Sequence, residues 1–314
     1  MAETKTEWYI IVNPRAGSGK TMSEWVPAER KLDKMGIPYV TAYTDHKKHA
    51  TSLAYDAASD GYRKIMAVGG DGSVHEMVSG VGRWCEDNAC NPEEFTLGVA
   101  PIGSGNDWIK SLGVPNDVNG VIDMMESASF SPIDLVKVKC ADGKNTFMAN
   151  GAGTGFDSHV CKRVNFQKES GMRNSMIYLN ALRYTIMHTR IIKVEVFADG
   201  VSVFSGNCYS IAIGNGRYSG GGMRQVPIAA VDDGLIDVMI VPKLSLPRIF
   251  KEIPRLFNGS VNESEHIIYK RCKTLEIVPL DADSRDIIEV DGEIEGQLPL
   301  SIEMDGKKVN VIRR

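Results

Sequence analysis

Residues 69–76 read Gly-Gly-Asp-Gly-Ser-Val-His-Glu, and they directly follow an apolar run, Ile65–Val68, that is typical of a buried strand. A helix is predicted from Ser73 to Val81. A strand that ends in glycines and leads into a helix lets backbone N–H groups approach a phosphate, and the helix N-terminus adds partial positive charge. Because each glycine costs conformational entropy on folding, such a turn is rarely kept for packing alone. The stretch predicts a phosphate-binding loop, with a simple tight turn as the alternative.

Strands and helices alternate through the first part of the chain. Apolar runs predict strands, and apolar residues at helical spacing predict the helices between them. The predicted strands are Trp8–Val12, Tyr39–Tyr43, Ile65–Val68 and Phe95–Ala100, and the predicted helices cover 22–35, 50–58, 73–81 and a stretch from about Asp107. This alternation indicates a doubly wound α/β domain, in which a parallel sheet carries helices on both faces.

The pattern changes near residue 133, where strands and turns begin to dominate. Two hairpins are predicted around Asp199-Gly200 and Asp305-Gly306. Further strands are predicted at 133–139, 208–214, 235–241, 274–278 and 287–290, and helices at 175–188 and 246–257. We therefore expect an α/β domain over residues 1–132 and a mainly β domain over 133–299, joined without a low-complexity linker.

The composition excludes several classes of protein. The chain has 314 residues, 43% hydrophobic and 24% charged, with a net charge of −4, which suits a two-domain globular enzyme and does not favour nucleic acid as a partner. No apolar run is long enough to span a bilayer, and the start, MAETKTEWYIIV, does not resemble a signal peptide. Without metal-ligand spacing, the six cysteines predict reduced thiols and a cytoplasmic location; they stand at 85, 90, 140, 161, 208 and 272.

Two more glycine-rich loops follow predicted strands of the first domain. Residues 13–21, Asn-Pro-Arg-Ala-Gly-Ser-Gly-Lys-Thr, end like a P-loop, but Pro14 stands where the first P-loop glycine should be and has no N–H. The other interpretations are amides of Gly17 and Ser18 that face an anion, or an N-cap at Ser18. Residues 100–107, Ala-Pro-Ile-Gly-Ser-Gly-Asn-Asp, form the third loop. Three such loops at successive strand ends indicate a nucleotide site.

The second domain offers three further motifs. Residues 214–222 are too rich in glycine for a simple turn and favour close backbone approach to a ligand or to the other domain. Asp232-Asp233-Gly234 could bind a divalent cation or form an exposed acidic turn. Asp291-Gly292-Glu293 reads first as a turn, since Asp-Gly occurs seven times in this chain. Phosphoryl transfer nevertheless requires a carboxylate that takes the proton of the acceptor hydroxyl.

Together these motifs resemble the diacylglycerol kinase catalytic family, which includes bacterial soluble lipid kinases and the related sphingosine and ceramide kinases. The pieces appear in family order over nearly the whole chain: Asn13-Pro14 with Gly17, Gly69–Ser73 with Glu76, Pro101–Asp107, Gly220–Gly222, Asp232–Leu235 and Asp291–Glu293. Ser73 stands where the family usually has Thr, and Gly105 lacks a hydroxyl that the family often carries near this position.

The resemblance implies an α/β nucleotide-binding domain and a C-terminal β-sandwich domain, as in NAD kinases, with the active site in the cleft. The last strands would return to the first domain, so that residues 300–314 pack there. Thr44 would also contact ATP, although an N-cap for the next segment explains it equally well. The residues implied to contact ATP are Asn13, Pro14, Arg15, Ala16, Gly17, Thr44, Gly69, Gly70, Asp71, Gly72, Ser73, Val74, His75, Glu76 and Ser104.

The same resemblance assigns the chemistry. Asp291 or Glu293 would supply the base, with the reactive Mg²⁺ near their turn, and Asp291→Ala is expected to abolish turnover with the fold intact. A structural Mg²⁺ would sit on the Asp233 carboxylate and on the carbonyls of Ala230 and Leu235. The predicted protein is an ATP- and Mg²⁺-dependent lipid kinase, with diacylglycerol as the expected acceptor and phosphatidic acid as the product.

Several alternatives remain open at this level. The acceptor could be a sphingoid base or another lipid. The rival functions are an NAD kinase, a non-catalytic nucleotide- or lipid-binding module, and a P-loop NTPase. A lipid substrate implies transient docking at a membrane surface, for which Arg248, Lys251 and Arg255 on the predicted helix 246–257 are candidates, unless they form an ordinary solvated face. Oligomeric state is open, with a homodimer among the possibilities.

Overall fold

The computed structural model describes residues 3–103, 105–126, 129–143, 145–170, 177–188 and 190–313. The chain divides into two compact units. The first contains Met1–Leu135 and Gly306–Arg314, and the second contains Val136–Asp305. The sequence placed the change of pattern at residue 133, near the point where the chain leaves the first unit.

The first unit is built on a six-stranded sheet in the order β2-β1-β3-β4-β17-β5. The strands pair in parallel except β5, which runs antiparallel to β17 at one edge. The strands are β1 (Lys5–Val12), β2 (Tyr39–Tyr43), β3 (Tyr62–Gly69), β4 (Thr96–Pro101), β5 (Phe130–Asp134) and β17 (Lys308–Ile312). The predicted doubly wound α/β domain is confirmed.

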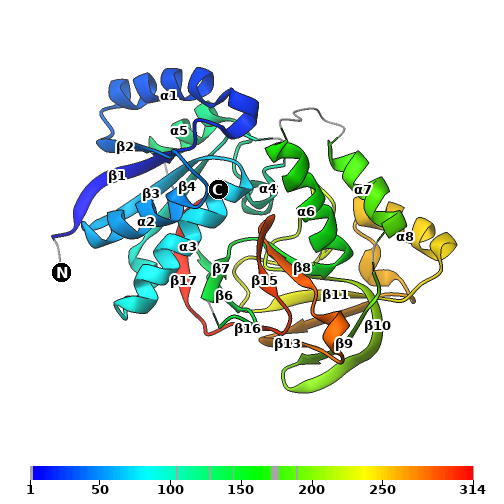
Figure 1. Cartoon of the computed structure of the whole chain (residues 1–314). Helices are drawn as coiled ribbons and strands as arrows, with labels where there is room; N and C mark the ends of the chain where they lie inside the picture. Colours follow the sequence, from blue (N-terminus) through cyan, green and yellow to red (C-terminus); the bar gives the residue numbers. More distant parts are fainter. Residues whose placement is uncertain are drawn as a thin grey trace. The chain divides into compact units, whose positions relative to one another are not determined.

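Helices cover both faces of this sheet, with α1 and α5 on one side and α2 and α3 on the other (Figure 1). Large apolar residues of α1 and α5, Trp25 and Ile122 among them, form one core with the sheet. On the other face α2 presents an alanine stripe, and a Cβ added at Gly80 of α3 would lie 2.4 Å from the Thr51 carbonyl oxygen. Small residues therefore let these two helices pack closely. The helices are α1 (Thr21–Met35), α2 (His49–Ser59), α3 (Asp71–Asp87), α4 (Asp107–Leu112) and α5 (Val118–Glu126).

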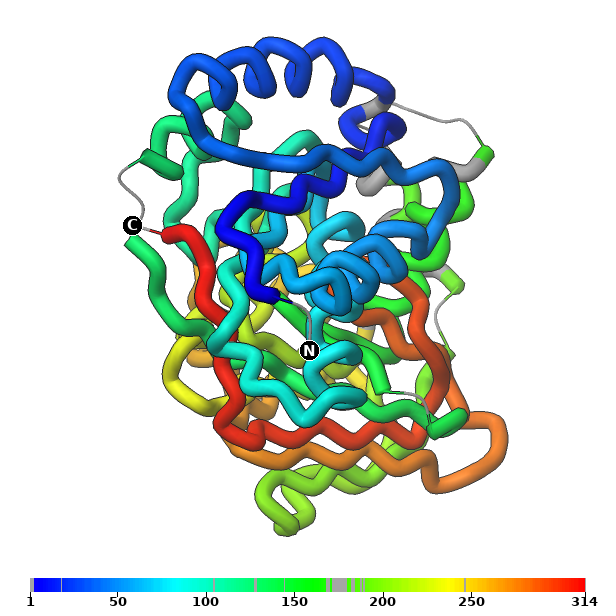
Figure 2. Tube along the Cα trace, turned by 90° about the vertical axis from the view of Figure 1, so that its left-hand side faces the viewer, coloured from blue at the N-terminus to red at the C-terminus, as the bar shows by residue number. Residues whose placement is uncertain are grey.

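The C-terminal strand corrects two expectations. Leu300–Met304 and Val309–Ile312 were expected to pair as a hairpin, but β16 (Leu300–Glu303) pairs with β13 and β6 in the second unit. β17 instead enters the first sheet between β4 and β5, and Figure 2 shows this red strand beside the green β5. Only the segment from Gly306 onward returns to the first unit, rather than all of residues 300–314.

The second unit is mainly β, and its strands enclose a large apolar core. β10 (Val201–Gly214) is a single long strand that pairs with β9 along its first half and with β8 and β11 along its second half. The sequence had predicted two separate strands here. The others are β6 (Val136–Lys139), β7 (Asn145–Met148), β8 (Gly151–Gly155), β9 (Ile192–Ala198), β11 (Ile236–Pro242), β12 (Ile268–Cys272), β13 (Thr274–Pro279), β14 (Ile287–Val290), β15 (Glu293–Gln297) and β16.

Three helices accompany these strands: α6 (Phe156–Glu169), α7 (Ile177–His188) and α8 (Leu246–Asn258). The sequence predicted α8 and most of α7, although Ser175 and Met176 lie outside the described residues. It did not predict α6, whose polar composition gives little apolar periodicity. This helix directly follows β8 and packs on β8, β10, β14 and β15.

Candidate active site

Three loops of the first unit follow β1, β3 and β4, and they lie together because parallel strands end at one edge of a sheet. The Asn13 side chain donates from Nδ2 to Ser73 Oγ at 3.3 Å, and the Ile102 amide donates to the Gly69 carbonyl at 2.8 Å. Gly17 has a φ of +54°, and an added Cβ would lie 2.6 Å from Ile102 Cγ2. Glycine therefore allows this close approach of the first and third loops.

Gly69 and Gly70 serve different purposes. An added Cβ at Gly69 would lie 2.3 Å from Ser73 Oγ, so this position is needed for packing against the start of α3. At Gly70 the nearest atoms would be 3.8 Å away, and its backbone (φ −97°, ψ −168°) suits any residue. Gly70 precedes α3 as its N-cap, and no side chain caps the helix there. A helix N-terminus without a side-chain cap has backbone N–H groups that can bind an anion.

Two acidic residues of the same stretch cap neighbouring helices. Asp71 Oδ1 accepts the amide of Asp107 at 2.9 Å, at the start of α4. Glu76 accepts the amides of Lys48 and Ala50 at 2.9 and 3.0 Å, at the start of α2. These carboxylates tie three helices of the first unit together, and their predicted contact with ATP stays a prediction.

The remaining residues assigned to ATP lie in varied surroundings. The side chains of Val74 and His75 are buried in the first unit, whereas Arg15 is exposed. Asn13 Oδ1 accepts the Arg15 amide at 3.0 Å and so closes the turn around Pro14. The Ala16 carbonyl accepts the hydroxyl of Thr21 at 3.0 Å, and Gly72 lies in the first turn of α3. Ser104 lies outside the described residues.

The alternatives for Thr44 and Ser18 as N-caps are wrong. Thr44 is buried, and its amide donates to the Val12 carbonyl at 2.9 Å, which extends the pairing of β2 with β1. The N-cap of α2 is Lys48. Residues Ala16–Gly19 form a 3-10 helix, and Lys20 is the N-cap of α1.

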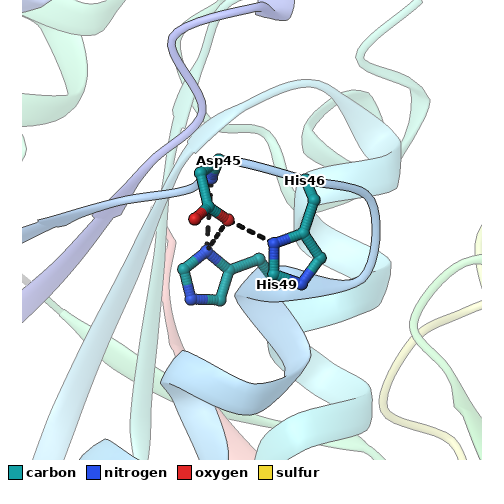
Figure 3. A group of neighbouring side chains, drawn as sticks. All are labelled: Asp45, His46 and His49. Atoms are coloured by element: carbon teal, nitrogen blue, oxygen red, sulfur yellow. Dashed lines mark hydrogen bonds and ion pairs between the residues drawn. The ribbon is translucent and has the colours of Figure 1, made fainter.

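A cluster that the sequence interpretation missed, Asp45, His46 and His49, follows Thr44 directly (Figure 3). Asp45 Oδ1 contacts Nδ1 of both histidines, at 2.7 Å for His49, and the two rings stack with centroids 4.5 Å apart. The hydrogen bond from His46 lowers the pKa of the Asp45 carboxyl below its ordinary value. The spacing Asp-His-x-x-His was the available signal. The cluster fixes the loop that leads from Thr44 into α2.

In the second unit Asp291 lies at the turn between β14 and β15. Asp291 and Gly292 have φ values of +49° and +86°, which suit a tight two-residue hairpin turn. The Asp291 side chain is 8% exposed, and its carboxylate accepts the amides of Ala149, Asn150 and Gly151 at 2.9, 2.8 and 2.9 Å. Such bonds from N–H groups to a carboxylate are among the stronger hydrogen bonds in proteins. Asp291 is therefore both a turn residue and a firmly held buried carboxylate.

The three amides that bind Asp291, which we call the amide cradle, are attached to the glycine-rich loop, residues 214–222. The Asn150 carbonyl accepts the amides of Asn215 and Gly216, both at 2.8 Å, and its Nδ2 donates to the Tyr218 carbonyl at 2.8 Å. A Cβ at Gly214 would lie 2.2 Å from Val226 Cγ2. Glycine is therefore needed at Gly214, where the start of the loop packs closely against Val226.

Glu293 begins β15, two residues after Asp291, and is partly buried. The peptide between them is held by α6, since the Gly292 carbonyl accepts Asn165 Nδ2 and Cys161 Sγ, each at 3.0 Å. The Gly292 amide donates to Glu289 Oε2 at 2.9 Å. The turn that carries both candidate bases is thus fixed on either side of Gly292, as a catalytic group must be.

A third carboxylate, Asp157 at the start of α6, was not predicted. It accepts Ser210 Oγ at 2.5 Å and Gln225 Nε2 at 2.7 Å, and Gln225 Oε1 accepts Ser219 Oγ at 2.5 Å. Burial raises the pKa of the Asp157 carboxyl, and the hydrogen bonds from Ser210 and Gln225 oppose that shift in part. Because Ser219 belongs to the glycine-rich loop, this network joins the loop to α6.

The predicted structural Mg²⁺ position is engaged by a guanidinium group. Asp233 Oδ1 accepts the Leu235 amide at 3.1 Å, and Oδ2 pairs with Arg271 Nη2. The same arginine bonds from Nε at 3.3 Å to Asp237, a fully buried carboxylate that also accepts the Tyr269 hydroxyl at 2.7 Å. Asp233 already has a cationic partner, so the residues do not fit an ion held by Asp233 and the carbonyls of Ala230 and Leu235.

Two family descriptions match the chain, one for each part. Residues 7–138 match the diacylglycerol kinase catalytic domain. Residues 151–313, more than half of the chain, match the YegS C-terminal NAD kinase beta sandwich-like domain. The order of the two matches is the order that the motifs predicted, and the P-loop NTPase alternative is thereby set aside.

Named relatives agree with these matches. A diacylglycerol kinase of Staphylococcus aureus is 28% identical over 291 residues, which cover 92% of this chain and 87% of the relative. The crystal structure of a diacylglycerol kinase from Bacillus anthracis has a TM-score of 0.75 at 23% identity and covers 98% of this chain and 97% of that one.

Yeast NADH kinase shares the fold more distantly, with a TM-score of 0.52 at 10% identity over 98% of this chain and 83% of its own. Among the described helices, none is long and apolar enough to cross a membrane. The predicted fold class, an α/β nucleotide-binding domain followed by a β-sandwich-like domain, is confirmed. The chain belongs to the diacylglycerol kinase catalytic family and is a lipid kinase.

Proposed function

We propose that this protein transfers the γ-phosphate of ATP to the free hydroxyl of diacylglycerol and so makes phosphatidic acid. The observation that carries the proposal is the Asp291–Glu293 turn, where two carboxylates lie on a hairpin fixed by the amide cradle and by α6. A left-handed backbone and a buried carboxylate are costly features, and such features gather at functional sites. The name of the Staphylococcus aureus relatives supports diacylglycerol as the acceptor.

Phosphoryl transfer requires positioning, removal of one proton and neutralisation of phosphate charge. In the first unit the amides at the start of α3 would bind ATP phosphates, and the exposed Arg15 would add a positive charge. In the second unit Asp291 or Glu293 would accept the proton of the lipid hydroxyl as its oxygen attacks phosphorus. The bond from phosphorus to the β-phosphate oxygen breaks, and ADP leaves.

A Mg²⁺ ion that arrives with ATP would neutralise the transferred phosphate, and the carboxylate oxygens of Asp291 and Glu293 are ligands of the type that it prefers. The donors present in the second unit thus fit a catalytic ion better than a structural ion at Asp233, whose carboxylate is paired with Arg271. We also propose that the enzyme is cytoplasmic and visits the membrane transiently, since its acceptor lies in a bilayer.

The test is transfer of labelled γ-phosphate from ATP, with Mg²⁺, to diacylglycerol and to a sphingoid base in mixed micelles, with NAD as a parallel acceptor. Label in phosphatidic acid is the expected result. Label in a phosphorylated sphingoid base would change the acceptor and keep the lipid kinase. Label on NAD would move the function to that of the more distant structural relative.

A further inference from the structure

Helix α8 packs on the second unit through one side only. Leu256 lies against a small apolar cluster that includes Met239 and Val261, and Ile249 and Ile253 are partly buried near the same side. The Arg224 amide donates to the Leu256 carbonyl at 2.6 Å and fixes the end of the helix to the neighbouring loop.

Two large aromatic residues of α8 are exposed. Phe250 and Phe257 are 56% and 60% exposed, and they stand seven residues apart, so that at about 100° per residue their rings lie on nearly the same side of the helix. Pro247 and Pro254 are exposed beside them. A helix of a soluble domain normally presents polar residues to water, and grouped exposed aromatic residues mark an interaction surface.

Positive charge borders these rings. Lys251 is exposed next to the two prolines, whereas Arg248 is exposed about 160° around the helix from Phe250. The acidic residue of α8, Glu252, pairs with Arg255 at 3.2 Å away from the rings, so that Lys251 is the charged residue beside them. Aromatic rings beside a lysine on one helix fit the boundary of an anionic bilayer, where rings enter the acyl region and a cation meets phosphate headgroups.

The helix is also connected to the candidate active site within the second unit. Arg224, which is bonded to Leu256, precedes Gln225, and Gln225 bonds to Ser219 of the glycine-rich loop and to Asp157. The same loop bonds through the Tyr218 carbonyl to Asn150 of the amide cradle. A membrane contact at α8 therefore lies one loop away from the segment that holds Asp291.

We propose that the exposed side of α8, formed by Pro247, Phe250, Lys251, Pro254 and Phe257 and called here the docking face, binds the surface of an anionic bilayer. This inference rests on the proposed function, because it supplies the contact through which the enzyme reaches a lipid acceptor. Phe250 and Phe257 insert between headgroups, and Lys251 binds lipid phosphates. The same residues make binding depend on anionic lipid and on salt.

The test compares sedimentation of the full chain with vesicles of phosphatidylcholine containing phosphatidylglycerol and with vesicles of phosphatidylcholine alone. The double variant Phe250→Ser/Phe257→Ser is expected to bind the anionic vesicles at least tenfold more weakly than the wild type. Phe130→Ser is the matched control, because Phe130 is 48% exposed on β5 of the first unit. The variant Lys251→Glu should lose the preference for anionic vesicles, and Lys34→Glu, on exposed Lys34 of α1, should keep it.

A second measurement separates docking from chemistry. Phosphorylation of a dissolved short-chain diacylglycerol should be unchanged in the double phenylalanine variant, whereas phosphorylation of long-chain diacylglycerol in vesicles should fall at least tenfold. If the wild type phosphorylates no lipid but binds vesicles through the two phenylalanines, the proposed function fails and the docking face stands. The docking face is overturned if the wild type does not bind vesicles, if the double variant binds like the wild type, or if the variant instead dissociates a dimer in light scattering, which would mean that a second copy covers α8.

Discussion

Asp291 combines a structural and a chemical requirement in one residue. Its carboxylate satisfies three backbone N–H groups, and its backbone is left-handed, a conformation that Asp and Asn adopt more readily than most residues. Asp291→Ala is therefore expected to destabilise the fold, although the sequence alone led us to expect an intact fold. Alanine would leave three amides without an acceptor, at about 1–3 kcal/mol for each buried group. Asparagine keeps an acceptor oxygen and suits the turn.

Either Asp291 or Glu293 is the proposed base. We predict that the variant of the base, Asp291→Asn or Glu293→Gln, lowers kcat by about 10²–10⁴-fold, the usual loss when a proton-transfer group is removed. Only the Asp291 variant should also lower the melting temperature, because only Asp291 binds the amide cradle. Steady-state kinetics and thermal melts on both variants distinguish the two roles. Asp142→Asn, at another Asp-Gly turn of the same unit, is the control and should keep activity. Full activity in both Asp291→Asn and Glu293→Gln would show that the turn does not take part in the mechanism.

Asp157 is predicted to make stability depend on pH. Burial raises its pKa in the folded state above the unfolded value of about 3.9, so folding favours the protonated form. Its contribution is complete below the unfolded pKa and is lost as pH rises through the folded pKa. Asp157→Asn removes that loss and can still bond to Ser210 and Gln225. The difference in melting temperature, variant minus wild type, should rise between pH 4 and pH 8. A difference that does not change with pH would contradict the assignment.

At the scale of elements, the two glycines before α3 have different roles: Gly69 is needed for packing, and Gly70 is expected to leave room for a phosphate. We predict that Gly70→Ala keeps the melting temperature, since the nearest atoms to the new methyl group would be 3.8 Å away. It should weaken ATP binding about tenfold or more, which corresponds to about 1.4 kcal/mol, because the methyl group hinders approach of a phosphate to the α3 amides.

The matched variant Gly69→Ala should lower the melting temperature. Its methyl group would lie 2.3 Å from Ser73 Oγ and 2.8 Å from Ser73 Cβ, and such overpacking typically costs about 1–3 kcal/mol. Calorimetric titration with ATP and thermal melts on both variants provide the readouts. Unchanged ATP affinity in Gly70→Ala would show that the start of α3 does not bind the nucleotide.

The Asp233–Leu235 turn before β11 is held by Arg271, and we predict that it needs no metal. Removal of divalent ions with EDTA should leave the melting temperature of the ATP-free protein unchanged. Arg271→Met should destabilise the protein by about 2 kcal/mol, less than a fully buried pair because Arg271 is about a third exposed. Lys270→Met, at the exposed neighbour, is the control. A large drop in melting temperature with EDTA would restore the predicted Mg²⁺ at Asp233.

Elements with a clear local signal were predicted from the sequence, and elements that depend on distant contacts were not. Tyr39–Tyr43 has the same bounds in the structure as in the prediction, and the helix predicted over 50–58 is α2. Helix α6 has too little apolar periodicity to be found, and the entry of β17 into the first sheet depends on pairing with β4, about two hundred residues earlier. The helix caps by Asp71 and Glu76 depend likewise on residues far along the chain.

At the scale of the whole molecule, the motifs predicted the family because they combine glycines with acidic residues in a fixed order across both units. The hydrogen-bond partners of the acidic residues could be identified only from the structure. Asp291 was found as one of seven Asp-Gly pairs, and its burial on three backbone amides distinguishes it from Asp199, which accepts two amides at an exposed turn. Asp157 was missed because a single carboxylate in a polar segment carries little information without its neighbours, whereas the spacing Asp-His-x-x-His at Asp45 was available in the sequence.

The central claim is that the first unit binds ATP and that the second supplies the base for phosphorylation of diacylglycerol. The most direct measurement is transfer of labelled γ-phosphate to diacylglycerol by the wild type, Gly70→Ala and Glu293→Gln, with ATP varied in each case. We predict labelled phosphatidic acid with the wild type. Gly70→Ala should raise the KM for ATP with little change in kcat. Glu293→Gln should lower kcat at unchanged ATP affinity if Glu293 is the base, and Asp291→Asn should do so if Asp291 is the base. The claim would be contradicted if the wild type labels no lipid, or if Asp291→Asn and Glu293→Gln both turn over like the wild type.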